Sequence, residues 1–196
     1  YDLSPNTMLF VKAAYFSQEQ QGSTRLSQTD TQIVDVSFGF DSQLSATSQL
    51  SARFYYLDEE FENDGTSLVE RGVRDAEFIS NTHETPSEDF GASLLWSQQF
   101  NHWLSNLSVG VDYRNVDGED DQDIFLSSGE AFLNQVAGGE QQFIGAFVEA
   151  SIKPTQNLEL LPSVRFDHVD LQDGVQTAAG TGADTPEINF ADQDID

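Results

Sequence analysis

The sequence predicts an all-β fold in which long antiparallel strands form part of a transmembrane β-barrel. Apolar and polar residues alternate along about seven segments, as they do in strands that have one apolar face. Each segment has about 10 to 12 residues, close to the 9 to 11 that a tilted strand needs to cross a bilayer. Short and long connections also alternate along the chain, which is typical of the two ends of an outer-membrane barrel.

The strands are expected at about residues 7–18, 31–41, 49–60, 89–99, 104–115, 141–153 and 158–169. The first follows Pro5 and Asn6, which are typical of a turn. The second alternates most regularly, because Val34 and Phe38 fall on one face and Asp35 falls on the other. The next three repeat this pattern and carry aromatic residues near their ends. Such residues suit the interfacial girdles of a membrane barrel, with ordinary core aromatics as the alternative.

The last two expected strands form a hairpin around Pro154. Apolar residues occupy alternate positions in both arms, and more polar residues occupy the positions between them. We expect the apolar face to contact lipid, and it comprises Ile144, Ala146, Val148, Ala150, Ile152, Leu160, Val164 and Phe166. The hairpin therefore has the two-sided character of a barrel wall.

The connections fall into two length classes. Short ones are expected near residues 42–48, 100–103 and 153–157, and long ones near 19–30, 61–88, 116–140 and 170–196. The long segments are polar and mostly acidic. We expect them to form long acidic loops outside the cell, while the short turns face the periplasm. Within the second long segment, residues 69–79 fit either a short helix or an extension of the neighbouring strands.

Composition excludes several classes of function. The 196 residues include 34 Asp and Glu but only 8 Lys and Arg, which gives a formal net charge of -26. This balance argues against a nucleic-acid partner, because phosphate binding needs a basic surface. The chain has no Cys, so disulfides, thiolate metal sites and cysteine nucleophiles are excluded. Neither a Gly-x-Ser-x-Gly elbow nor a phosphate-binding glycine loop occurs, and we expect neither enzymatic activity nor a cofactor.

The hairpin and two other segments resemble a known family. Residues 139–149, followed by Lys153-Pro154 and by the run Val-Arg-Phe-Asp at 164–167, are similar to a barrel hairpin of TonB-dependent outer-membrane receptors. Residues 86–96 and 110–114 also resemble barrel strands of that family. In order along the chain, and with the alternation of connections, the matching segments cover most of the predicted sheet.

The resemblance implies a place in the bacterial outer membrane and the uptake of a scarce nutrient, which is an iron chelate, cobalamin or an oligosaccharide. It also implies a plug domain inside a barrel of about 22 strands, with energy supplied through TonB. No plug is evident in residues 1–196, and about seven strands do not close such a barrel. We therefore expect an interior portion of the barrel, in contact with the lipid bilayer, the plug domain and the substrate.

Two groups of charged residues are candidate sites. The densest acidic cluster suits calcium, which takes carboxylate and carbonyl oxygens, or is a solvated acidic loop: Asp117, Glu119, Asp120, Asp121 and Asp123. The second group lies on polar strand faces and comprises lumen charges that pair across strands or touch plug and substrate: Arg53, Asp112, Arg114, Arg165 and Asp167. His168, near Asp167 and Asp170, offers a further three-residue arrangement for a metal.

Two other functions also fit the pattern. The chain could be a self-standing acidic β-sheet protein of a cell surface or a filament, in which the apolar face would pack on a second sheet. It could also be a small outer-membrane barrel that acts as an adhesin or an anchor, with an eighth strand within 61–88. A sandwich and a membrane barrel differ in the surroundings of four residues: Val34, Val36, Phe38 and Phe40.

Overall fold

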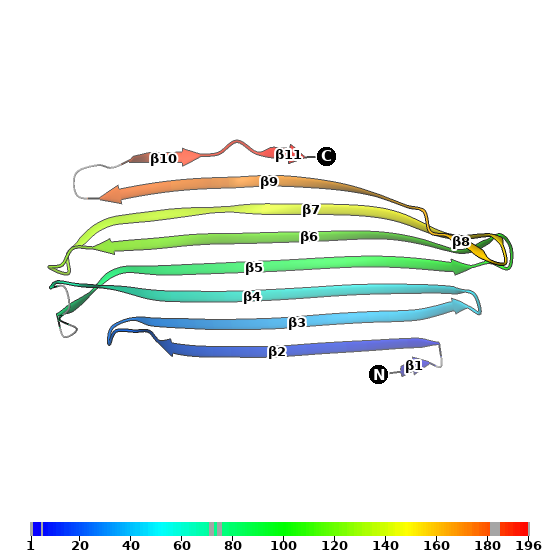
Figure 1. Ribbon diagram of the computed structural model, residues 1–196, viewed down its shortest axis with the longest axis horizontal. Helices are drawn as coiled ribbons and strands as arrows, with labels where there is room; N and C mark the ends of the chain where they lie inside the picture. The colour runs from blue at the N-terminus through cyan, green and yellow to red at the C-terminus, as the bar shows by residue number, and fades with distance from the viewer. Residues whose placement is uncertain (1, 5, 71–72, 74–75, 181–184, 196) are drawn as a thin grey trace.

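The computed structural model describes residues 2–4, 6–70, 73, 76–180 and 185–195, which form one antiparallel β-sheet (Figure 1). Over these ranges there is no helix of the length and apolarity needed to cross a membrane. The strands are β1 (Asp2–Ser4), β2 (Thr7–Gln21), β3 (Gln28–Ser45), β4 (Ser48–Leu68), β5 (Glu77–Gln99), β6 (Leu104–Phe125), β7 (Ala131–Thr155), β8 (Leu158–Leu160), β9 (Ser163–Gly180), β10 (Thr185–Asn189) and β11 (Gln193–Ile195). The all-β fold class is confirmed.

The strands follow one another across the sheet in chain order. Pairing runs from β1 through β7 to β9 and β10, while β8 pairs with β7 and β11 pairs with β9. Figure 1 shows β10 and β11 end to end along β9. They act as one interrupted edge strand, and at the interruption the backbone N–H of Phe190 donates to the carbonyl of Gly174 at 2.7 Å. Within the described part of the chain, the two edges of the sheet do not pair with each other.

The strands are longer than the sequence pattern indicates. β5 and β7 have 23 and 25 residues, and at about 3.3 Å per residue β7 is roughly 80 Å long. The bounds of the loops expected at 19–30, 61–88 and 116–140 are corrected, because most of these residues belong to strands. The connections are residues 22–27, 69–76 and 126–130. Backbone hydrogen bonding continues where both faces of the sheet become polar, so the apolar alternation stops before the strand does.

The two ends of the sheet still differ in their connections. At one end, the short-turn end, residues 46–47, 100–103 and 156–157 make the turns. At the other end the strands extend far beyond their apolar parts before they turn. Residues 77–79 of the undecided segment begin β5, and 170–180 complete β9, whereas 181–184 lie outside the described residues.

One face of the sheet carries a continuous apolar belt. Residues paired on neighbouring strands share a face, and the belt consists of alternate residues within 9–15, 34–40, 50–56, 90–96, 107–113, 144–152 and 164–166. Its side chains are open to the surroundings, with Val11 72% exposed and Val164 71% exposed. The described residues include no buried apolar side chain and no second sheet. They therefore lack the second layer that a self-standing β-sandwich requires.

The apolar belt crosses the hydrogen-bonded rows obliquely. Successive pairings lead from Leu9 of β2 to Phe166 of β9, and from Tyr15 to Gln172. On the belt face of β9, however, the apolar residues end at Phe166. The belt therefore moves toward the short-turn end between β2 and β9. Strands of membrane barrels are tilted by roughly 35–45°, and a level apolar band on tilted strands produces such an offset.

Candidate functional site

The face opposite the apolar belt, here called the network face, carries three paired arginines. The first is Arg53 of β4, which lies directly opposite Gly39 of β3. Its guanidinium donates two hydrogen bonds of 2.8 Å to Asp41 and lies 5.2 Å from the centroid of the Phe10 ring. A Cβ atom on Gly39 would overlap that ring. The glycine therefore leaves the space in which the aromatic ring and the ion pair lie side by side.

The second arginine, Arg114 of β6, repeats this arrangement. It lies opposite Gly91 of β5 and donates to Asp89, with an Nη2 to Oδ2 distance of 2.7 Å. Asp89 also accepts a hydrogen bond of 3.0 Å from the hydroxyl of Tyr55, whose ring covers Gly91. The Asp89 side chain is only 15% exposed, and its three donors satisfy both of its oxygens.

The third arginine reaches across a whole strand. Arg165 of β9 donates two hydrogen bonds of 2.9 Å to Asp112 of β6 and one of 2.7 Å to Asp167. Gly145 of β7 lies between the two strands and is paired with both aspartates. A Cβ atom there would lie 2.5 Å from Oδ2 of Asp112 and would overlap Arg165. The bridge over β7 therefore depends on the missing side chain of Gly145.

The network face thus brings the five predicted lumen charges onto one surface, and Arg165 joins the two predicted aspartates. Arg53 and Arg114 instead bind Asp41 and Asp89, which the sequence analysis did not single out. The available signal was the interior glycines, since a glycine within a strand often marks a close approach of neighbouring groups. The assignment of these charges to a lumen stays a prediction.

These ion pairs fix positions more than they stabilise the sheet. The arginine side chains are 41% to 52% exposed, and pairs so open to water contribute about 0–1 kcal/mol each. Each of the three arginines described on the network face has at least one carboxylate partner, and Arg165 has two. The face therefore presents little uncompensated positive charge with which to attract an anion.

The predicted calcium ligands lie in strand β6 rather than in a loop. Because successive residues of a strand point to opposite faces, Asp120 lies on the network face, where Thr85 donates to it at 3.2 Å. The other four share the opposite face, and Asn134 donates to Asp121 and Asp123 at 2.7 and 3.0 Å. The five carboxylates do not converge on one point. Calcium binding stays a prediction for the four that share a face.

Beyond the apolar belt, acidic residues stand directly opposite one another across five strands. The row comprises Glu19, Asp30, Glu62, Glu84 and Asp121. Like charges in such positions repel and destabilise the pairing of strands. Burial, followed by the charges of Glu84 and Glu60, raises the pKa of the Glu62 carboxyl above its usual value of 4.5. Part of the repulsion is therefore relieved by proton uptake as the pH falls.

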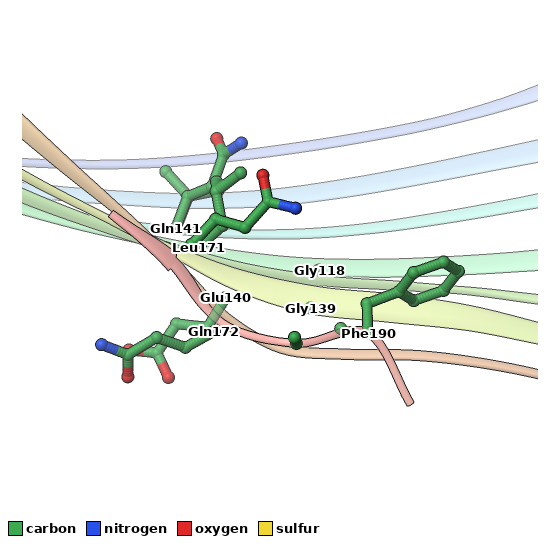
Figure 2. A pocket seen from close by; sticks show the side chains of 11 residues that line it. Gly118, Gly139, Glu140, Gln141, Leu171, Gln172 and Phe190 are labelled. Carbon is green, nitrogen blue, oxygen red and sulfur yellow. The ribbon is translucent and has the colours of Figure 1, made fainter. Parts of the chain in front are cut away.

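A groove opens on the network face where three glycines meet. Gly118 of β6 is paired with Gly139 of β7, and a Cβ atom on Gly139 would lie 3.3 Å from the Cα of Gly174 in β9. We call this the glycine groove. Figure 2 shows Gln141, Leu171 and Phe190 extending to one side of the strands, while Glu140 and Gln172 extend to the other. The floor is therefore bare backbone, and the walls are an amide, an aliphatic side chain and an aromatic ring.

The glycine groove has the dimensions of a small-molecule site. Its volume is about 460 Å³, within the range of roughly 300–1,000 Å³ that is usual for such sites. A bare backbone floor lets a ligand or a peptide segment approach closely, and the ring and amide walls supply stacking and hydrogen bonding. The sequence analysis missed this groove, because all of its lining residues except Gln141 lie in two segments that were assigned to loops.

Comparison with known proteins identifies one family. The family described as TonB dependent receptor-like, beta-barrel matches residues 1–193. Neither the curated proteins nor the solved structures contain a significant match.

Proposed function

Because the chain belongs to the TonB dependent receptor-like β-barrel family, we propose that it forms part of the wall of a channel for a bulky, scarce nutrient. The family is one of transporters and receptors of the bacterial outer membrane, rather than of enzymes. The oblique apolar belt is the observation that carries the proposal. No second layer of the described residues covers the belt, and many of its side chains are exposed. The belt runs obliquely across the strands, as an apolar band does on the tilted strands of a membrane barrel.

The two faces and the two ends of the sheet assign its orientation in this proposal. The apolar belt contacts lipid, and the network face lines the lumen. The short-turn end lies at the periplasm, while the long polar parts of β4 to β7 stand outside the cell. The glycine groove then opens into the outer part of the lumen, on the path of an incoming ligand.

The proposed substrate is an iron chelate, cobalamin or an oligosaccharide, and the proposed partners are a plug domain and TonB. The paired arginines of the network face favour a ligand that is uncharged or cationic on the side that meets this wall. The walls of the glycine groove support the same preference, because they offer an amide and an aromatic ring rather than a basic group.

Uptake by nutrient-starved cells tests the proposal. Cells lacking the gene are supplied in turn with a labelled ferric chelate, cobalamin and an oligosaccharide. We expect uptake of one of the three to fall to the level of wild-type cells treated with a protonophore, because TonB draws on the proton gradient. Unchanged uptake of all three classes would overturn the proposed transport and would favour the adhesin or anchor.

A further inference from the structure

A cluster of one histidine and two aspartates lies at the edge of the sheet, away from the network face. His168 and Asp170 are alternate residues of β9 and share the belt face, just beyond the last belt residue, Phe166. Asp194 of β11 is paired directly with Asp170. One ligand atom from each of the three side chains lies within 4.8 Å of the others, and His168 Nε2 is 3.6 Å from Asp170 Oδ2.

The charges of this cluster are unbalanced without a cation. Two carboxylates stand directly opposite each other on adjacent strands, a placement that destabilises pairing when both are ionised. The arginine of β9, Arg165, lies on the other face, where it binds its own aspartates. A bound cation would offset the repulsion between these two carboxylates.

The donor set indicates the class of cation. One imidazole nitrogen with two carboxylate oxygens suits zinc and similar first-row metals better than calcium, which takes oxygen ligands only. Bonds of about 2.1 Å in a tetrahedral zinc site place neighbouring ligand atoms roughly 3.4 Å apart. The separation of His168 Nε2 and Asp170 Oδ2 is already 3.6 Å. Small side-chain movements would bring Asp194 to the same distance and leave the fourth position to water.

We infer that His168, Asp170 and Asp194 form a binding site for one divalent transition-metal ion, with zinc as the representative ion. The site lies on the outside of the barrel wall, at the outer boundary of the apolar belt, and not in the lumen. The ion joins β9 to β11, which is held to β9 along only three paired residues. Bound between Asp170 and Asp194, the ion converts a repulsive pair into a link. The site does not depend on which nutrient is transported.

Zinc binding to the purified protein in detergent micelles tests the inference. Isothermal titration with zinc chloride should show one saturable site. His168→Ala should weaken zinc binding by about tenfold or more, because loss of even an outer-shell partner of a metal ligand costs about 10–100-fold in affinity. His83→Ala is the matched control, because His83 also pairs with an aspartate, Asp120, at 3.4 Å. Within the described residues that pair belongs to no three-ligand group. We expect the His83→Ala variant to bind zinc as tightly as the unmodified protein.

A second variant tests whether weaker zinc binding results from loss of a ligand rather than from a change of fold. Asp194→Asn keeps the shape of an exposed side chain on the edge strand and should also weaken zinc binding at least tenfold. Cobalt provides an independent readout, since its visible absorption distinguishes a tetrahedral protein site from the hydrated ion. The inference is overturned if zinc does not bind saturably, or if both variants bind it as tightly as the unmodified protein. Equal weakening by His83→Ala would overturn it as well.

Discussion

Replacement of Gly145 by alanine tests whether the arginine bridge over β7 depends on a missing side chain. The new methyl group would lie 2.5 Å from Oδ2 of Asp112 and 3.0 Å from the guanidinium carbon of Arg165. One of the two side chains must move, which breaks a pair of 2.9 Å hydrogen bonds. Forcing a methyl group into an occupied space costs about 1–3 kcal/mol. Loss of a half-exposed ion pair adds up to about 1 kcal/mol.

We therefore expect Gly145→Ala to lower the free energy of unfolding by roughly 2–3 kcal/mol. The assay is equilibrium unfolding by guanidinium chloride in lipid vesicles, followed by tryptophan fluorescence. Gly118→Ala is the matched control, since the nearest atoms to its new methyl group are 3.9 Å away. It should change stability by less than about 0.5 kcal/mol.

Asp112→Ala extends the test to the bridge itself. Without the Asp112 side chain, the methyl group of Gly145→Ala has only Arg165 to displace. Gly145→Ala should therefore lower the free energy of unfolding less in the Asp112→Ala background than in the unmodified protein. Strict additivity of the two changes, or equal effects of Gly145→Ala and Gly118→Ala, would refute the reasoning.

Three further predictions concern the belt, the acidic row and the groove. Val164→Arg on the apolar belt should lower stability in vesicles by up to about 4 kcal/mol, because a charge on the lipid-facing side of a membrane barrel is costly, most of all at the bilayer midplane. Ser163→Arg, on the other face, should cost less than about 1 kcal/mol, and equal costs would contradict the assigned faces. The raised pKa of Glu62 means that the folded sheet holds this proton more tightly than the unfolded chain. The contribution of Glu62 to stability is therefore fully present below pH 4.5 and is lost as the pH rises through the raised value. Glu62→Gln should remove that part of the pH dependence of amide exchange in β4, and an unchanged profile would exclude Glu62 as its source. Gly139→Val should fill the glycine groove and reduce nutrient uptake several-fold without loss of the protein from the outer membrane, whereas unchanged uptake would exclude the groove from the transport path.

The sequence predicted the part of each strand that crosses the belt, because one apolar face there produces a period of two. The prediction of strands failed where both faces of a strand become polar. Beyond Tyr56, β4 continues through Asp58 and Glu62, and acidic residues on a hydrogen-bonded strand have the composition of a loop. Only pairing with neighbouring strands distinguishes such a strand from a loop, and this pairing is not visible in the sequence of a single segment.

The contacts of the network face were predictable in kind but not in detail. Arginines and aspartates on polar strand faces indicated ion pairs. Their partners depend on register, however, as when Arg165 binds a carboxylate 53 residues away, across an intervening strand. A register shift of one residue would place Asp112 on the opposite face of the sheet. The glycine groove depends on register in the same way, because Gly118, Gly139 and Gly174 meet only after three strands are aligned.

The long strands also limit how the mouth of the channel can close. In β7, residues 131–143 extend beyond the belt, which amounts to roughly 40 Å of hydrogen-bonded wall. The connections at that end, residues 22–27, 69–76 and 126–130, are short. In the proposed orientation the paired strands would place the entrance well above the lipid, and these short connections would add little cover over it.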